Sequence, residues 1–348
     1  MRNVADALGI SQAAVSLALR NSAEISEKRR LEIQSAAQRL GYVPNAAAIS
    51  LSHFKHSTRH TPIQAGLAWL TFSPDAADER ATAACDANWR GAVEAARSLG
   101  YSLEEFNCDK KLPPCRLAGI LAARGMQGIV LPQRHGPLSG VHRDFDWSRF
   151  ATIRIGYSAE YPPVHLVCES QARDTLLAID KMREKGYRRI GHITTRSVLA
   201  AGLFDGAYFK SQYCAGEKGL PLLVLKDHAA PEEGDAVREV DAWMKAHRPE
   251  AILTAAPNTR ALLETAGYCV PRDVAVAAAS IGQCDVDAGM SSSPGEVGRI
   301  AISTLVRLVQ RNEVGIPDYP VEILVRGKWT DGGTLPPARE PSLCHRAN

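Results

Sequence analysis

The side chains best suited to contact another molecule lie near the start of the chain, just after Gly9. Ser11 has the hydroxyl typical of a helix N-cap, and the helix that follows it is expected to present a largely polar outward face. Glutamine, serine and arginine side chains hydrogen-bond to the base edges and phosphates of DNA, and an apolar side chain contacts the methyl group of thymine. The candidate contact residues are Ser11, Gln12, Ala13, Ser16, Leu17 and Arg20.

Three short helices are expected to hold this face in place. Asn3 can cap the first helix, and Gly9 supplies the permissive backbone that a tight turn needs. A third helix is expected to begin at Ser26 and to stop at Gly41. The apolar positions that recur at three- and four-residue spacing are Ala14, Val15, Ala18 and Leu19 in the second helix and Ile33, Ala36, Ala37 and Leu40 in the third.

The charge of this segment agrees with a nucleic-acid contact. Residues 1–60 hold eight Lys and Arg against four Asp and Glu, a net charge of +4, and the rest of the chain carries a net charge of −1. This excess suits phosphate contact, although it is small for a module that binds alone. The elements together predict a helix-turn-helix DNA-binding domain over residues 1–43. The alternative is a small helical cap or dimerisation element.

The head resembles the LacI/GalR-type (lactose-repressor) family of bacterial transcription regulators. The fragments that carry the resemblance are Val4-Ala5, Gly9-Ile10-Ser11, Ala14-Val15-Ser16, Ile25-Ser26, Leu40-Gly41-Tyr42 and Pro44-Asn45. In that family the second helix enters the major groove, and the resemblance implies that Gln12, Ala13 and Leu17 read bases. Leu17 departs from the arginine that is frequent in the family. We therefore expect Gln12 to make most of the hydrogen-bonded contacts to bases, on an operator unlike the usual half-site.

Residues 44–60 are expected to form a hinge helix and a linker. Pro44 fixes φ at a helix start, and Asn45 and the alanines after it favour a helix with little apolar surface. The resemblance implies that this helix folds when two copies meet in the minor groove, where Asn45 and Ala48 lie and Leu51 wedges into the central base step. The alternative is an ordinary tether, because residues 50–61 are rich in Ser, His and Thr.

The remaining residues are long enough for two α/β lobes. Apolar runs alternate with amphipathic stretches, which predicts parallel sheets with helices on both faces and ligands at the carboxyl ends of strands. The expected strands are 65–72, 128–132, 152–157, 189–193, 251–254, 274–279 and 321–325, and the expected helices are 89–99, 170–185, 233–246, 259–266 and 296–309.

This order of elements resembles the family's core, which is like a two-lobed periplasmic sugar-binding protein with three crossovers. The matching fragments include Gly128-Ile-Val-Leu131, Gly186-Tyr-Arg-Arg-Ile-Gly191 and Val270-Pro-x-Asp-Val-Ala275. We expect a core over 61–335, with a first lobe of about 61–156 plus 283–317, a second lobe of about 157–282 plus 318–335, and a tail over 336–348.

The residues that hold the effector in the family have changed here. If Gly206 is the family's glycine, Leu203 stands where sugar-binding members have an arginine, and Ser280 stands where they have an aspartate. The loss of a guanidinium and a carboxylate removes the groups that hold sugar hydroxyls, so we expect a small-molecule effector bound in another mode. The candidate effector contacts are Phe72, Gln133, Arg196, Leu203, Asn258 and Ser280.

Several other classes of protein are disfavoured. The eight cysteines form no CxxC pair and have no His partner at zinc spacing, so reduced thiols are expected and no metal site. The chain lacks a signal peptide, a membrane-length apolar run and the common nucleotide-binding and hydrolase motifs. We therefore expect a cytoplasmic, nucleoid-associated protein with no cofactor and no catalytic residues. The acid pairs Asp144 with Asp146 and Glu232 with Glu233 keep an α/β enzyme as an alternative.

The sequence thus predicts an all-α helix-turn-helix head on a two-lobed α/β core that is like a periplasmic binding protein. We expect a homodimeric repressor on a palindromic double-stranded DNA operator, with an effector between the lobes that changes the affinity for DNA. The second alternative is a DNA-binding dimer whose core no longer binds a ligand.

Overall fold

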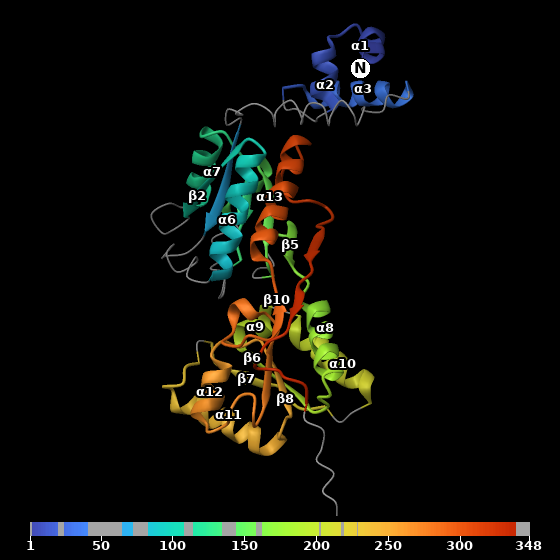
Figure 1. Cartoon of the computed structure of the whole chain (residues 1–348). Helices are drawn as coiled ribbons and strands as arrows, with labels where there is room; N and C mark the ends of the chain where they lie inside the picture. Colours follow the sequence, from blue (N-terminus) through green and yellow to red (C-terminus); the bar gives the residue numbers. More distant parts are fainter. Residues whose placement is uncertain are drawn as a thin grey trace, which may run out of the picture.

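The structure is a computed structural model that describes most of the chain in ten segments. These segments are residues 2–19, 24–40, 65–71, 83–107, 114–133, 144–157, 162–201, 203–216, 219–227 and 229–338. Figure 1 shows a helical head and two α/β lobes. Within these segments, no helix has the length and apolar character needed to cross a lipid bilayer.

The head consists of three helices around a small apolar core. They are α1 (Arg2–Leu8), α2 (Gln12–Leu19) and α3 (Glu27–Arg39). Gly9 has a φ of 62°, a value that favours glycine, and this lets the chain turn sharply from α1 into α2. The buried core residues are Val4, Ala5, Val15, Ala18, Ile33 and Ala37, with Leu8, Ile10, Leu19 and Ile25 packed against them.

The head differs from its prediction at three positions. Asn3 lies inside α1, because the helix already begins at Arg2, so Asn3 does not cap it. Leu40 is 50% exposed instead of buried, because α3 ends at the residue before it. Ser26 precedes α3 as expected, but its side chain makes no capping hydrogen bond.

The first lobe is built on a six-stranded sheet in the order β11-β5-β4-β3-β1-β2, in which all neighbouring strands are parallel. The strands are β1 (Ala65–Thr71), β2 (Tyr101–Asn107), β3 (Met126–Leu131), β4 (Ala151–Ile155), β5 (His165–Glu169) and β11 (Glu322–Val325). The helices are α6 (Ala83–Ser98), α7 (Pro114–Ala123), α13 (Pro294–Gln310) and the 3-10 helix η2 (Trp147–Arg149). Helices α6 and α13 cover one face of the sheet and α7 packs on the other.

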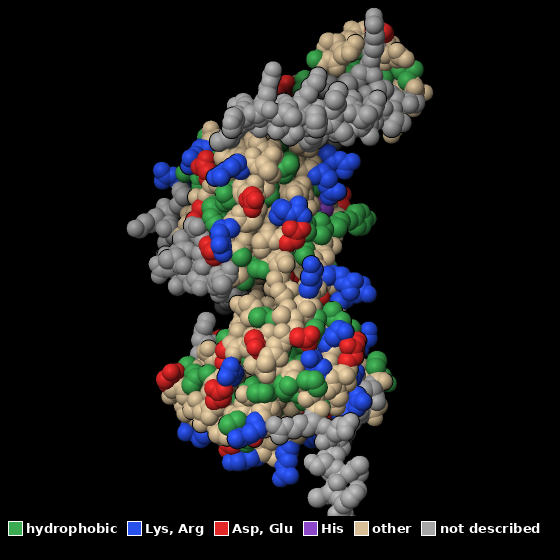
Figure 2. Space-filling view, viewed as in Figure 1, with side chains coloured by type: hydrophobic (Ala, Val, Ile, Leu, Met, Phe, Trp, Pro, Cys, Tyr) green, Lys and Arg blue, Asp and Glu red, His purple; other side chains and the backbone are tan. Residues whose placement is uncertain are grey.

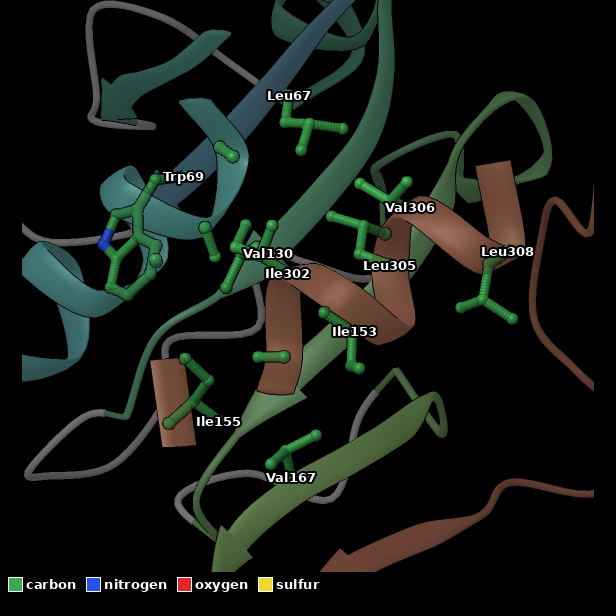
Figure 3. Close-up of a cluster of buried hydrophobic side chains, with 14 of the residues drawn as sticks. Leu67, Trp69, Val130, Ile153, Ile155, Val167, Ile302, Leu305, Val306 and Leu308 are labelled. Atoms are coloured by element: carbon green, nitrogen blue, oxygen red, sulfur yellow. The ribbon is translucent and has the colours of Figure 1, made fainter. Parts of the chain in front are cut away.

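Helix α13 contributes a large part of the apolar core of this lobe. Figure 3 shows Ile302, Leu305 and Val306 of α13 beside side chains of the sheet such as Val130 and Ile153. All five side chains are at most 3% exposed. This buried face explains why the sequence pattern of α13 reads so clearly as an amphipathic helix.

The helices α6 and α13 approach each other very closely. A Cβ atom added to Gly298 of α13 would lie 2.0 Å from the carbonyl oxygen of Asn88 on α6. A Cβ added to Gly91 of α6 would lie 1.9 Å from the carbonyl oxygen of Gly295. The two backbones can therefore meet only because glycine stands at these positions.

The second lobe has a six-stranded sheet in the order β12-β10-β9-β8-β6-β7, in which only β12 is antiparallel to its neighbour. The strands are β6 (Ile190–Thr195), β7 (Leu223–Leu225), β8 (Ala251–Thr254), β9 (Ala275–Ala278), β10 (Gly289–Ser291) and β12 (Lys328–Thr330). The helices are α8 (Gln171–Glu184), α9 (Arg196–Ala201), α10 (Phe204–Ala215), α11 (Gly234–His247), α12 (Thr259–Thr265) and the 3-10 helix η3 (Ile281–Gln283). Helices α8 and α10 pack on one face of the sheet, and α11 and α12 pack on the other.

The chain passes between the lobes three times, as the family resemblance implies. Strand β5 leads into α8, β10 leads into α13, and β11 leads into β12. All three crossings leave the carboxyl ends of strands that run parallel to a neighbour, so the carboxyl ends of both sheets face the boundary between the lobes. Figure 2 shows that the molecule narrows at this boundary.

The predicted lobe boundaries are wrong at all three crossings. The prediction assigns 157–282 and 318–335 to the second lobe, yet β5 and β11 pair with each other in the first sheet. It assigns 283–317 to the first lobe, yet β10 pairs with β9 in the second sheet. At each crossing the chain adds one more strand to the sheet of the lobe it is leaving before it crosses, β5, β10 and β11 respectively. The start of the predicted tail packs on the second lobe, where the Ala338 amide donates to the Lys185 carbonyl at 2.7 Å.

Candidate nucleic-acid interface and inter-lobe site

Hydrogen bonds hold α2 at both of its ends. At its start, the Ala14 amide donates to Ser11 Oγ at 3.1 Å, so Ser11 caps the helix as the sequence predicts. At its end, Gln34 of α3 donates from Nε2 to the Ala18 carbonyl oxygen at 2.9 Å. The last carbonyl groups of a helix have no partner within that helix, and Gln34 donates a hydrogen bond to one of these carbonyls here. The first bond fixes the start of α2, and the second ties its end to α3.

The face of α2 that points away from α1 and α3 carries part of the predicted contact set. Gln12 and Ala13 are exposed, Leu17 is half-buried, and Val15 and Ala18 have no exposed surface. The helix therefore presents an amide side chain and a small side chain at its first two positions. The Ser16 side chain and the predicted residues Arg20, Asn45, Ala48 and Leu51 lie outside the described part of the chain.

Sequence analysis missed the role of Gln34. Gln34 could have been recognised as a polar residue that directly follows the buried Ile33, in a helix whose other polar residues lie mainly on the exposed side. A long amide side chain at the edge of a buried stripe can reach a backbone carbonyl of the neighbouring helix.

Most of the candidate effector contacts lie at the edge of a sheet that faces the boundary between the lobes. Gln133 follows β3 in the first lobe, and Arg196, Asn258 and Ser280 follow β6, β8 and β9 in the second. Strands β6, β8 and β9 are neighbours in their sheet, so the last three residues share one edge. Leu203 precedes α10 and does not follow a strand, and Phe72 lies outside the described residues.

The candidate effector residues of the second lobe differ in their exposure and in their hydrogen bonds. Arg196 is exposed, whereas Asn258 has a φ of 59° and its Nδ2 donates to the Ala229 carbonyl at 3.2 Å. Leu203 is 50% exposed, and its amide donates to Gln171 Oε1 of α8 at 2.9 Å. The Asn258 amide thus holds a loop of the second lobe, while Arg196 and the Leu203 side chain face solvent.

A partly buried polar cluster connects the three crossings between the lobes. Glu169, at the end of β5, hydrogen-bonds to Ser292 in the second crossing, and Ser292 Oγ lies 3.2 Å from Ser280 Oγ. Asp174 of α8 accepts a hydrogen bond from the Gly327 amide in the third crossing at 2.9 Å. Burial raises the pKa of both carboxyl groups. We call Glu169, Asp174, Ser280, Ser292 and Gly327 the hinge cluster.

Of the hinge cluster, sequence analysis singled out Ser280 alone. Glu169 ends a short strand that was not predicted, although an acidic residue directly after the apolar run Leu166-Val167-Cys168 was a usable signal. Its partners come from segments far along the chain, so no local pattern identifies them.

Asp146, one of the four acids behind the enzyme alternative, has a structural role, and so does a buried His–Asp pair that sequence analysis did not single out. Asp146 Oδ1 accepts hydrogen bonds from the Ser148 amide at 3.2 Å and the Ser148 hydroxyl at 2.6 Å, which caps η2. His192 and Asp205 are buried 3.1 Å apart inside the second lobe, where they join β6 to α10. The six described cysteines are free thiols, of which some are buried and some exposed.

Two family models match this chain. Residues 1–45 match the bacterial regulatory proteins of the lacI family, and residues 179–330 match a periplasmic binding protein-like domain. No curated protein matches the chain significantly by sequence.

Solved structures share the fold over nearly the whole chain. A complex of the transcriptional regulator CelR with cellobiose has 18% identity and a TM-score of 0.60, with 95% of this chain and 98% of that chain covered. The lac repressor dimer bound to operator and the anti-inducer ONPF has 16% identity and a TM-score of 0.58, with 96% and 98% covered. A lacI-family transcriptional regulator from Silicibacter pomeroyi has 18% identity and a TM-score of 0.54, with 96% and 98% covered.

The two family models match the two parts of the chain that the structure shows, the helical head and the two-lobed core. The fold is that of known regulators in which the same two parts occur together. The head of this chain is thus a domain of the lacI family of bacterial regulatory proteins, joined to a periplasmic binding protein-like core, and the chain is a DNA-binding transcription regulator.

Proposed function

We propose that two copies of this chain repress transcription by binding a palindromic operator, with α2 of each copy in the major groove of one half-site. The observation that carries the proposal is the way α2 is presented: Ser11 and Gln34 fix its two ends, and Gln12 and Ala13 remain exposed at its start. A recognition helix of this kind contacts base edges with its N-terminal residues. The repressor acts where the chromosome lies, in the nucleoid of the cytoplasm.

Residues 44–60 serve as the hinge in this proposal. Asn45, Ala48 and Leu51 contact the minor groove when the hinge segments of the two copies meet, and Leu51 enters the central base step. This arrangement brings the two half-sites close together, so the operator is a palindrome with little or no spacer.

A small molecule between the lobes controls this binding. The carboxyl ends of both sheets face the lobe boundary, and the hinge cluster connects all three crossings there. A ligand that favours one orientation of the lobes changes the position of the two heads and so the affinity for DNA, by a coupling free energy of about 1–3 kcal/mol. Leu203 and Ser280 offer no charged group to a sugar, which supports an effector of another chemistry.

The alternative is a DNA-binding dimer without an effector. Leu203 and Ser280 also favour this alternative. The buried Ser280 hydroxyl is already bonded to Ser292 inside the hinge cluster, so it is less free to hold a ligand. A thermal-shift screen of small metabolites separates the two cases. A ligand at 100 times its Kd stabilises the folded chain by about 2.7 kcal/mol, whereas a ligand-free core gives no shift with any compound.

Binding of the full-length protein to sheared genomic DNA, followed by sequencing, tests the main proposal. We expect a small number of enriched sites that share an inverted repeat, and we expect Gln12→Ala to lose this enrichment while it keeps weak general binding. Uniform coverage of the genome by the unmodified protein would contradict the proposal.

A further inference from the structure

A basic segment joins α8 to β6 in the second lobe. Residues 181–189 contain five Lys and Arg and one Glu. The two lysines are paired, because Lys181 lies 2.6 Å from Glu184 and Lys185 lies 2.8 Å from Asp331. The three arginines of the segment have no carboxylate within ion-pair distance in the described part of the chain. They are Arg183, Arg188 and Arg189.

These three arginines line one cavity of about 320 Å³. Arg183 donates from Nη2 to the Ser211 carbonyl at 3.1 Å, and Arg189 donates from Nε to the Arg248 carbonyl at 3.3 Å. Both guanidinium groups are thus held in place by neutral acceptors. The Arg188 guanidinium makes no bond to any described residue, and its backbone amide is held by Glu250 at 2.7 Å.

Part of the remaining cavity wall is apolar, and Ser211, Gln212 and Gly219 complete it. Ile179 of α8, Ile190 of β6 and Leu220 form the apolar part together with Tyr208 of α10, which is 1% exposed. The Tyr208 hydroxyl lies 3.1 Å from the Ile190 carbonyl and 3.0 Å from the Leu220 carbonyl, so the wall is fixed by bonds of its own. In Figure 1, α8 and α10 lie side by side on this flank of the second lobe.

This cavity is separate from the region between the lobes. It lies at the amino end of β6, whereas the carboxyl end of β6 faces the lobe boundary. Basic residues often gather at the end of a helix because they complement its dipole, which accounts for Lys181, Arg183 and Lys185. It does not account for Arg188 and Arg189, because both lie beyond the end of α8.

We propose that this cavity binds a small organic anion and is a second ligand site of the regulator. Guanidinium groups bind phosphate and carboxylate through paired, charge-assisted hydrogen bonds. Three arginines line this cavity, none of them has a carboxylate partner among the described residues, and the Arg188 guanidinium is the one that is also without a hydrogen bond to them. The volume is that of a small-molecule site, and the apolar wall contacts the carbon skeleton of the ligand. The ligand is therefore a phosphate ester or a polycarboxylate, with its charge on Arg188.

Titration calorimetry on the full-length protein tests this site, with fructose 1,6-bisphosphate, citrate, inorganic phosphate and uncharged glucose at matched ionic strength. We expect saturable binding of the bisphosphate or of citrate, and no binding of glucose. Which of the two anions binds shows whether the ligand is a phosphate ester or a polycarboxylate. Arg188→Gln is expected to weaken this binding about tenfold or more, equivalent to about 1.4 kcal/mol. Because the Arg188 guanidinium has no hydrogen-bond partner among the described residues, this variant is expected to fold normally.

Two control variants make the test specific. Lys210→Gln removes the same charge from an exposed position on α10 that does not line the cavity, and we expect it to change the Kd less than about twofold. Arg260→Gln removes a charge from an exposed position on α12, on the opposite face of the sheet, and is expected to leave anion binding unchanged. The proposal is overturned if no anion binds saturably, or if Lys210→Gln weakens binding as much as Arg188→Gln does.

Discussion

At the scale of single residues, Gln34 is the side chain that positions the DNA-contacting helix. It reaches from α3 to the last turn of α2, and the Ala18 carbonyl that it binds would otherwise lack a partner inside the helix. Gln12 can read DNA in one register only if α2 keeps a fixed angle to the rest of the head. The base-contacting role of Gln12 therefore depends on Gln34, although Gln34 itself contacts no base in the proposed complex.

Replacing Gln34 tests this dependence. Gln34→Met keeps the volume of the side chain but removes the hydrogen bond, which costs the head about 1 kcal/mol of stability. We expect the amides of α2 to exchange hydrogen about fivefold faster, as measured by mass spectrometry. Gln38→Met is the control, because Gln38 is exposed on the same helix. Equal exchange rates in Gln34→Met and the unmodified protein would contradict this account.

Glu169 makes the stability of the core depend on pH. Burial raises the pKa of Glu169 in the folded chain above the ordinary value of a glutamic acid, which the unfolded chain keeps. At a pH between the unfolded and the folded pKa, the unfolded chain has released this proton while the folded chain still holds it. The free energy of unfolding contributed by this group therefore falls as the pH rises through this range.

Glu169→Gln removes this dependence and keeps a side chain that can bind Ser292. We expect the variant to gain stability relative to the unmodified protein as the pH rises from 4 to 7, measured by urea unfolding with tryptophan fluorescence. The matched control is Glu94→Gln on the exposed face of α6. If the difference between Glu169→Gln and the unmodified protein stays constant with pH, the carboxyl group of Glu169 is not held protonated by the fold.

At the scale of elements, strongly patterned segments were predictable and weakly patterned ones were not. The helices expected at 170–185, 233–246 and 296–309 appear as α8, α11 and α13 within two residues. Strand β2 was missed because it carries two glutamates and every one of its residues is only half-buried. Strands β7 and β10 were missed because each has only three residues.

The contact between α6 and α13 leads to a prediction about two glycines. Gly298→Ala places a Cβ against the Asn88 carbonyl, so we expect the free energy of unfolding to fall by about 1–3 kcal/mol. A Cβ atom added by Gly119→Ala in α7 meets no atom within 4 Å. We therefore expect the free energy of unfolding of this variant to rise by about 0.5–1 kcal/mol, because alanine favours a helix. Urea unfolding of both variants measures the difference, and equal effects would show that the two helices do not meet at this distance.

At the scale of the whole molecule, the order of the parts was predictable and the points where they join were not. The head and the two lobes each have a local sequence pattern. The head has cap residues and a glycine turn, and the lobes have apolar runs that alternate with amphipathic stretches. The crossings depend on which sheet β5, β10 and β11 join, and that is decided by pairing between strands far apart in the sequence. The same holds for the hinge cluster, which assembles from distant segments.

The central claim is that this regulator reads a palindrome through α2, and selection of duplexes from a random DNA pool tests it most directly. The full-length protein is used at two salt concentrations, and the bound DNA is sequenced. We predict one enriched palindrome with closely abutting half-sites at both concentrations, since specific base contacts persist when phosphate contacts weaken. Bound DNA without a common sequence, lost uniformly at the higher salt concentration, would contradict the claim.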